Sequence, residues 1–365
     1  MITASKYFAS CSGVMLLATF ILKFGIVLQS ESALAVAVDA DLVKHRDPPF
    51  KEVHFFNDKY KIYNMSNHVF YWLYTKEQTK GQLLNISDPN MIKSTNFDAE
   101  NPTKILVHDW LGSFYEKECF CTRIAKAYFK VGLYNVICVD WMQFSFDIMY
   151  ESAKLNAKYI GNDIANVLEI LTNKMSVGFE NIHLIGHGLG AHIVGYTGKQ
   201  LSGKMSRITG LDPVGPLYEK TDPKYMIDKS DANFVDIIHT NGNSLGLFKP
   251  LGHIDFYPNG GVAQLNCKKV DRVTGGACSH AKAFDYFAQC ILAKDKCKAL
   301  KCTQWSEYKE RECDEFAKST YMGEYVDKKQ NGNYYLWMDS TVNNIMINNY
   351  YSVNALAPTV LPKKI

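Results

Sequence analysis

A tight, glycine-flanked turn between an apolar strand and an apolar helix constrains this chain more than any other feature. Residues 182–185 read Ile-His-Leu-Ile, the composition of a buried strand, and Gly-His-Gly-Leu-Gly follows at residues 186–190. An apolar, helix-compatible run begins at Ala191. The outer glycines let such a turn close, so that the central side chain points out above the sheet. That central residue is Gly188, which has no side chain.

The turn by itself would fit any doubly wound sheet, but the same succession of an apolar strand and a helix recurs along the rest of the chain. From about residue 100, short apolar segments alternate with helical patterns, which is typical of a mostly parallel sheet covered by helices. Apolar residues from Ile160 to Leu171 recur with helical periodicity on one face. We therefore expect an α/β fold, with residues 36–103 as an N-terminal extension of the sheet. The expected strands are residues 104–108, 136–140, 182–186, 207–212 and 234–239, with a further candidate at 69–74.

Composition and charge bound the function only broadly. The chain has 365 residues, 47% of them hydrophobic and 21% charged, enough to bury one or two sizeable cores. The formal net charge is +3 and there is no dense Lys/Arg run, which argues against a nucleic-acid partner.

The first 35 residues indicate a signal peptide. Lys6 precedes an apolar stretch at residues 14–28, and Ala-Leu-Ala at residues 33–35 is a small-residue cleavage pattern. An uncleaved membrane anchor remains the alternative because the stretch approaches spanning length, and Lys23 weakens both interpretations. We expect a secreted, extracellular protein with no transmembrane segment in its mature part, residues 36–365.

Cysteine usage agrees with secretion. The chain has ten cysteines; Cys11 lies in the expected signal peptide, and six cluster near the C-terminus without the paired C-x-x-C spacing of zinc ligands. We therefore expect disulfides. The odd remainder of nine predicts a free thiol among Cys119, Cys121 and Cys138. The clustered cysteines are Cys267, Cys278, Cys290, Cys297, Cys302 and Cys313.

Further motifs surround the turn in a recognisable order. After position 188 come Asp212 at a strand end and His280 before a predicted helix from Ala281, which is the order of nucleophile, acid and base in α/β-hydrolases. The motifs are His-Asp-Trp-Leu-Gly at 108–112, Val-Asp-Trp at 139–141, Gly-Leu-Asp-Pro-Val-Gly-Pro at 210–216, Gly-His-Ile-Asp-Phe-Tyr-Pro-Asn-Gly-Gly at 252–261 and Cys-Ser-His at 278–280. Over roughly residues 65–340 the chain resembles the pancreatic lipase family, closest to its secreted phospholipase A1-like and insect neutral-lipase members.

The resemblance implies an α/β-hydrolase fold and assigns roles to individual residues. Asp212 matches the acid that orients the histidine, and His280 matches the general base. Gly188 occupies the position of the serine nucleophile. The backbone N–H groups of Trp110 and Leu189 match the oxyanion hole.

A second departure from the family lies beside the first. The family pattern before the oxyanion loop is His-Gly-Trp or His-Gly-Phe, whereas this chain has Asp109 in place of the glycine. A carboxylate there opposes the stabilisation of a developing oxyanion, unless it pairs with a nearby cation or points outward. His187 and His192, which flank the elbow, are expected to be scaffold residues.

The resemblance also describes the regions around the site. The family lid lies between Cys267 and Cys278, and here it is a short, mostly polar segment, residues 268–277, as in the phospholipase A1 branch. It further implies the pairs Cys290–Cys297 and Cys302–Cys313. About 50 residues follow Cys313, too few for a second β-sandwich, so a single lipase domain is expected.

Two functions follow from these observations. The first is a pseudoenzyme that binds lipid or a protein partner, because glycine cannot attack a carbonyl and losing such a nucleophile costs roughly 10⁶-fold in turnover. The alternative is an active carboxylic ester hydrolase of the phospholipase A1 or triacylglycerol lipase type, acting in lipid catabolism. The expected partner is a lipid, a lipid-like ligand or a lipid surface, and neither a cofactor nor a metal is expected. Acceptor sequences at Asn64 and Asn85 fit a glycoprotein.

Overall fold

The computed structural model describes residues 68–112, 119–145, 149–314 and 316–339. The expected signal peptide at residues 1–35 and the acceptor sequence at Asn64 lie outside these ranges. Within them, no helix combines the length and the apolar character needed to cross a bilayer.

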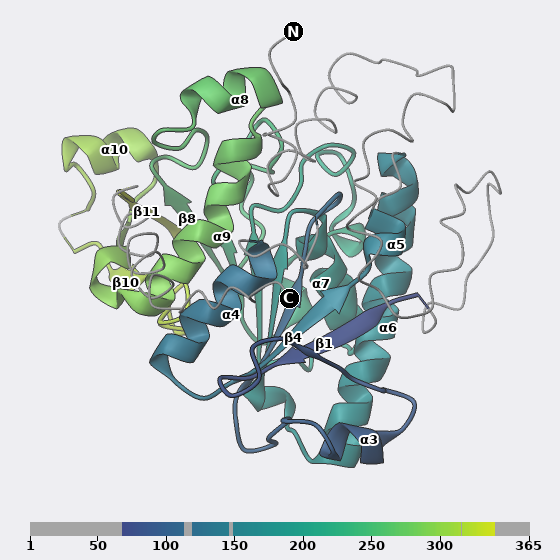
Figure 1. Ribbon diagram of the computed structural model, residues 1–365. Helices are drawn as coiled ribbons and strands as arrows, with labels where there is room; N and C mark the ends of the chain where they lie inside the picture. Colours follow the sequence, from purple (N-terminus) through teal and green to yellow (C-terminus); the bar gives the residue numbers. More distant parts are fainter. Residues whose placement is uncertain (1–67, 113–118, 146–148, 315, 340–365) are drawn as a thin grey trace, which may run out of the picture.

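The described residues form one eleven-stranded sheet, which confirms the predicted α/β-hydrolase type of fold (Figure 1). The strand order is β10-β9-β11-β8-β7-β6-β5-β3-β4-β1-β2, parallel from β11 to β4 and antiparallel at both ends. The strands are β1 (Phe70–Tyr74), β2 (Gln82–Leu83), β3 (Thr103–Val107), β4 (Asn135–Asp140), β5 (Ile182–His187), β6 (Arg207–Leu211), β7 (Val235–Ile238), β8 (Ile254–Pro258), β9 (Lys298–Lys301), β10 (Ser319–Tyr321) and β11 (Gly332–Leu336).

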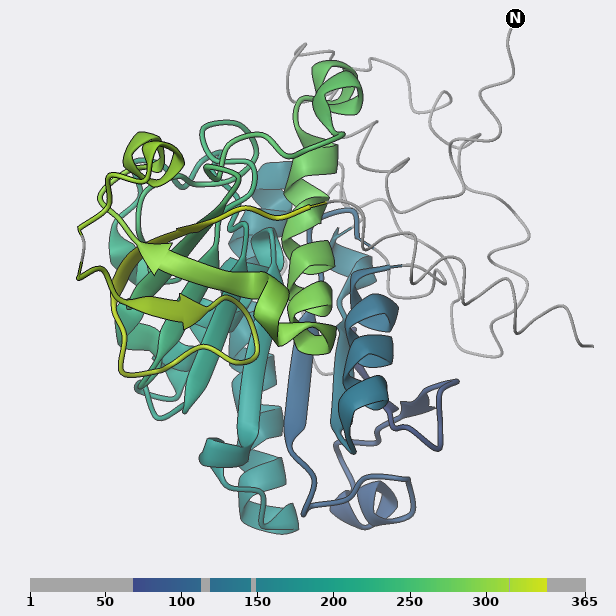
Figure 2. The same ribbon diagram turned by 90° about the vertical axis from the view of Figure 1, so that its left-hand side faces the viewer.

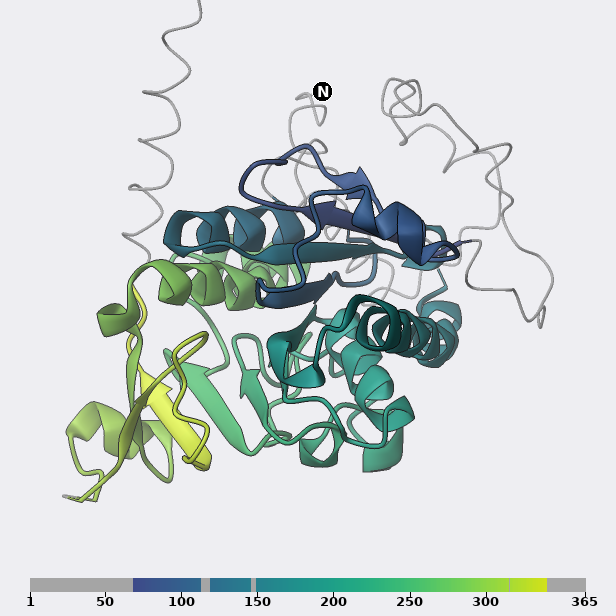
Figure 3. The same cartoon turned by 90° about the horizontal axis from the view of Figure 1, so that it is seen from below.

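Helices cover both faces of this sheet, with α4 and α9 on one face and α6 and α7 on the other (Figure 3). Alternate strand residues point to opposite faces, so Ile105 and Val107 join the core under α6 while Leu106 joins the core under α4. The helices are α3 (Pro89–Lys93), α4 (Phe120–Val131), α5 (Met142–Ser145), α6 (Tyr150–Met175), α7 (Leu189–Gln200), α8 (Lys268–Thr274), α9 (Ala277–Leu292) and α10 (Trp305–Glu310), with 3-10 turns at Phe179–Asn181, Pro223–Tyr225, Lys229–Asp231 and Lys294–Cys297.

The structure confirms all six predicted strands to within two residues at each end, and the periodic helix. One boundary is wrong, because α9 begins at Ala277 and not at Ala281, so His280 lies inside the helix. Gly275 and Gly276 both have positive φ and end α8, which allows the chain to turn sharply and start the next helix early.

The disulfides correct one prediction and confirm the others. Cys121 on α4 pairs with Cys138 on β4, and Cys119 is also disulfide-bonded, so no described cysteine is a free thiol. The prediction from the odd count is therefore wrong; α4 packs onto β4 and holds the two Cα atoms 6.1 Å apart, within bonding range. The predicted pairs are present: Cys267–Cys278, Cys290–Cys297 and Cys302–Cys313.

Candidate functional site

The glycine-flanked turn has the geometry that the sequence predicts. Gly188 has φ 57° and ψ −117° and links the end of β5 to the first residue of α7, Leu189. A Cβ on Gly190 would collide with the carbonyl groups of Val107 and His108, so a glycine is needed where α7 crosses the end of β3. The turn therefore places position 188 at the carboxyl edge of the parallel strands, where ligand sites of such sheets lie.

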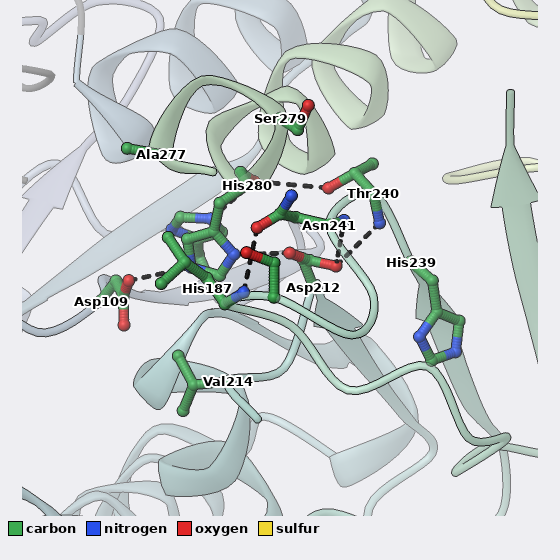
Figure 4. A network of polar contacts seen from close by, with 12 residues as sticks. Asp109, His187, Asp212, Val214, His239, Thr240, Asn241, Ala277, Ser279 and His280 are labelled. Carbon is green, nitrogen blue, oxygen red and sulfur yellow. Dashed lines mark hydrogen bonds and ion pairs between the residues drawn. The ribbon is translucent and has the colours of Figure 1, made fainter. Parts of the chain in front are cut away.

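Asp212 and His280 meet above this turn (Figure 4). The Asp212 carboxylate follows β6, is fully buried, and its Oδ2 lies 2.5 Å from Nδ1 of His280. Its Oδ1 accepts the backbone N–H groups of Thr240 at 2.7 Å and Asn241 at 3.0 Å, both from the segment after β7. Nothing in the local sequence marks Thr240 or Asn241 as a backbone donor, so the sequence did not predict these two supporting residues.

Asp109 completes the cluster from the end of β3. Its Oδ1 accepts the backbone N–H of Leu189 at 2.6 Å, and its Oδ2 lies 3.0 Å from Nε2 of His280. Of the two outcomes that the sequence left open, Asp109 therefore pairs with a nearby cation and does not point outward. The backbone donor matched to the oxyanion hole is occupied by this side chain.

The Asp109 carboxyl group also fills the space above Gly188. A Cβ on Gly188 would lie well inside van der Waals contact with Cγ and both oxygens of Asp109. A side chain at position 188 would therefore need the volume that the Asp109 side chain fills. The glycine at 188 leaves this volume empty, and the aspartate at 109 occupies it.

The two carboxylates control the charge of His280. Burial alone would lower the pKa of this histidine, but the hydrogen bonds and charges of Asp109 and Asp212 outweigh it and raise the pKa to about 10. Burial would raise the pKa of Asp109, and His280, His187 and the Leu189 N–H together lower it instead. At neutral pH His280 is therefore protonated, and its two ring N–H groups donate to Asp109 and Asp212.

His187 and His192, the two histidines that flank the turn, contact other residues of the protein core, as expected of scaffold residues. Burial lowers the pKa of His187 to about 4, and its neutral ring packs 4.5 Å from that of His280 while Nε2 donates to the His280 carbonyl at 3.2 Å. Burial lowers the pKa of His192 to about 3, its Nε2 donates to the Val214 carbonyl and its Nδ1 accepts the Ile227 N–H.

Trp110 and its neighbours shape the wall beside Asp109. The Trp110 ring is buried and meets the ring of Tyr150 edge to face, with centroids 5.1 Å apart. The Trp141 indole N–H donates to the His108 carbonyl at 3.0 Å, which holds the end of β3 in place. These two contacts fix the residues on either side of Asp109.

The predicted lid is a short helix. Residues 268–277 form α8, the two glycines that follow it and the first residue of α9, and α8 lies at the end of α9 (Figure 2). The Cys267–Cys278 disulfide closes this segment. The Asp271 carboxylate accepts the N–H of Ser279 at 3.0 Å and also its hydroxyl group, which ties α8 to α9.

Two described groups of side chains have ligand atoms close enough to hold a metal ion. In the first, one atom from each of Asp109, His187 and His280 lies within 4.8 Å of the others, but Asp109 and His280 already form a direct ion pair. In the second, Cys267 and Cys278 are joined in a disulfide beside Asp271, so their sulfurs are not thiolate ligands.

Residues 47–343 match the protein family described as Lipase. The chain is 36% identical over 278 residues to inactive pancreatic lipase-related protein 1 from Homo sapiens, covering 70% of this chain and 59% of that protein. It is 33% identical over 261 residues to pancreatic lipase-related protein 2 from Homo sapiens and 35% identical over 248 residues to the Cavia porcellus protein of the same name; each match covers 66% of this chain and 55% of the relative. The chain thus spans between 55% and 59% of the length of these relatives.

Proposed function

The chain belongs to the lipase family, and from this we propose that it is a secreted, catalytically inactive lipase-fold protein that binds lipid at the retained site. The observation that carries the proposal is the Asp109 carboxylate, which lies where a nucleophile at position 188 would stand and bonds both the Leu189 N–H and His280.

This arrangement removes three requirements of serine-type ester hydrolysis at once. Gly188 offers no hydroxyl to attack the carbonyl carbon. A general base needs a free lone pair, and His280 donates both ring N–H groups. The Leu189 N–H is not available to a developing oxyanion because Asp109 accepts it.

The expected losses in rate argue against residual ester hydrolysis. Loss of the nucleophile alone costs roughly 10⁶-fold, and loss of one oxyanion donor costs about 10²- to 10³-fold when a nucleophile is present. These factors do not add, since a site without a nucleophile has no tetrahedral intermediate for the donor to stabilise. A relative that is 36% identical carries the name inactive pancreatic lipase-related protein 1 and so offers a precedent for inactivity in this family.

Exposed apolar side chains support a lipid contact at the carboxyl edge of the sheet. They come from the segments that follow β6 and β8 and from α8, all of which lie beyond the carboxyl ends of parallel strands. Apolar side chains gathered at one edge favour contact with an apolar ligand or surface. These residues are Leu217, Val262, Leu265, Val270 and Val273.

The test has a catalytic arm and a binding arm. Purified protein is incubated with a fluorophosphonate probe, phosphatidylcholine and tributyrin, and labelling and product release are measured; we expect neither. Separately, flotation with phosphatidylcholine vesicles is expected to carry the protein to the lipid layer. Labelling at any residue or turnover of either ester would establish the alternative, an active carboxylic ester hydrolase, and protein that stays at the bottom of the gradient would refute lipid binding.

Secretion has its own support and test. The described part of the chain holds four disulfides in addition to the bonded Cys119, which suits an oxidising compartment. Expression of the full chain in cultured cells is expected to release the protein into the medium, and retention of all of it in the cell would contradict this.

A further inference from the structure

Positive charge is concentrated on α8, the helix that forms the lid. This helix has seven residues, and its three basic side chains, Lys268, Lys269 and Arg272, are all exposed. Its one acidic residue, Asp271, turns the other way and accepts the N–H and hydroxyl groups of Ser279 on α9. Since Ser279 directly precedes His280, α8 is attached to the turn of α9 that carries the candidate site.

The helical period separates a buried side of α8 from an exposed one. Asp271 and Thr274 are three residues apart and therefore lie on the same side, toward the protein, where Thr274 is only 2% exposed. The other five residues of the helix are exposed and form a continuous strip, because residues three or four apart are neighbours on a helix surface. We call this strip the cationic face of α8; it consists of Lys268, Lys269, Val270, Arg272 and Val273.

The described residues around the cationic face do not cancel its charge. Within the ranges that the structure describes, none of its three basic side chains forms an ion pair. Two other segments supply apolar side chains to the same edge of the sheet. Residues 217–225 hold two acidic and two basic residues, and residues 259–267 hold no charged residue. The excess of positive charge therefore belongs to α8.

Contacts at both ends hold α8 in place. The Cys267–Cys278 disulfide joins the residue before the helix to α9. At the other end, the Ser244 hydroxyl donates to the Gly275 carbonyl at 2.7 Å. Because the helix is fixed in this way, its side chains are presented without the loss of conformational entropy that a loose segment would incur on binding.

Resting on the proposed lipid binding, we propose that the cationic face of α8 docks on an anionic phospholipid surface. Each Lys or Arg close to a negatively charged bilayer strengthens binding by attraction to the headgroups. Val270 is 43% exposed and Val273 is 62% exposed, and apolar side chains beside cations on a helix enter the boundary between headgroups and acyl chains. A soluble acidic polysaccharide would match the cations but leave both valines in water, so the combination favours a bilayer.

Vesicles of different charge test this proposal on the full-length protein. Flotation with phosphatidylcholine vesicles is compared with flotation after part of that lipid is replaced by phosphatidylserine or by phosphatidylglycerol. Either anionic lipid is expected to lower the lipid concentration needed for half-maximal binding about tenfold or more. The gain is expected to disappear between about 0.05 M and about 0.5 M NaCl, because salt screens exposed charges.

Variants locate the effect on the helix. Lys269→Gln and Arg272→Gln each remove one charge and are each expected to weaken binding to phosphatidylserine vesicles about fivefold at low salt. At about 0.5 M NaCl the variants and the wild type are expected to bind alike, whereas a folding defect would persist there. Lys174→Gln is the matched control, because Lys174 is an exposed lysine in the last turn of α6, at the opposite end of the sheet from α8.

The outcomes separate this proposal from lipid binding itself. Protein that floats with phosphatidylcholine and gains nothing from an anionic lipid keeps the proposed function and overturns the role of α8. Protein that floats only with anionic vesicles supports the role of α8 and refutes binding by apolar contact alone. The proposal is also overturned if Lys269→Gln and Arg272→Gln bind as Lys174→Gln does. Heparin that binds tightly while anionic vesicles gain nothing would assign the cations to an acidic polysaccharide instead.

Discussion

The carboxyl group of Asp109 occupies the volume that any side chain on Gly188 would need. The two departures from the family pattern are therefore one structural change. The side chain of a serine at 188 and that of the aspartate at 109 would compete for the same space above the turn. In this protein the aspartate occupies it and accepts hydrogen bonds from the Leu189 N–H and from His280. Reversal of one substitution without the other leaves an overfilled or an empty site.

Restoring the serine alone is expected to fail. Gly188→Ser forces the Asp109 carboxylate away from the turn, so we expect a loss of about 1–3 kcal/mol in the free energy of unfolding and little ester hydrolysis. Asp109→Gly combined with Gly188→Ser vacates that space, frees the Leu189 N–H and returns the nucleophile. The double variant is expected to hydrolyse p-nitrophenyl butyrate faster than either single variant and to react with a fluorophosphonate.

The single variant Asp109→Gly is the control for this experiment, since it opens the site without supplying a nucleophile. Equal rates for Gly188→Ser and the double variant would show that Asp109 does not obstruct the site.

Asp109→Asn tests the charge of His280 with little change in shape. The variant removes one of the two carboxylates that raise the His280 pKa to about 10, so this pKa is expected to fall. NMR titration of the histidine Hε1 resonances in wild-type and variant protein measures the shift. A His280 resonance that titrates at the same pH in both proteins would mean that Asp109 has no part in holding the proton.

The same pair makes stability depend on pH in a definite direction. The folded protein holds the His280 proton more tightly than the unfolded chain, because the pKa rises from 6.5 to about 10. Its contribution is complete below pH 6.5 and is lost as the pH rises through about 10. Urea unfolding at about pH 6 and about pH 11 is expected to show wild-type protein losing a few kcal/mol more than His280→Gln. Parallel losses in the two proteins would contradict the ion-pair assignment.

Lipid binding at the carboxyl edge is expected to depend on α8. Val273 is 62% exposed on this helix, so Val273→Asp places a charge on the proposed contact surface without disturbing the core. Flotation with phosphatidylcholine vesicles is expected to recover about a fifth or less of the wild-type amount. Val131→Asp, at the end of α4, is the control and should float as wild type does. Equal loss in both variants would point to a nonspecific effect of charge.

Local patterns in the sequence were enough to predict the main strands, the long helix and the turn of this protein. Alternating apolar segments predicted β3 to β7, and the 3.6-residue repeat of Ile160 to Leu171 predicted the long helix α6, because periodicity depends only on which side of an element is buried. The two outer glycines predicted the turn at Gly188, and chain order predicted that Asp212 and His280 belong together.

Only the tertiary structure decided what the site became. Asp109 and His280 are 171 residues apart, and their ion pair exists because the end of β3, the turn after β5 and the first turn of α9 meet at one edge of the sheet. The same is true of Cys121 and Cys138, which an odd cysteine count could not pair, and of Trp305 and Tyr335, whose ring centroids lie 6.2 Å apart. Periodicity records burial along one element, whereas the space above Gly188 is filled by the Asp109 side chain, which the fold brings from the end of another strand, β3.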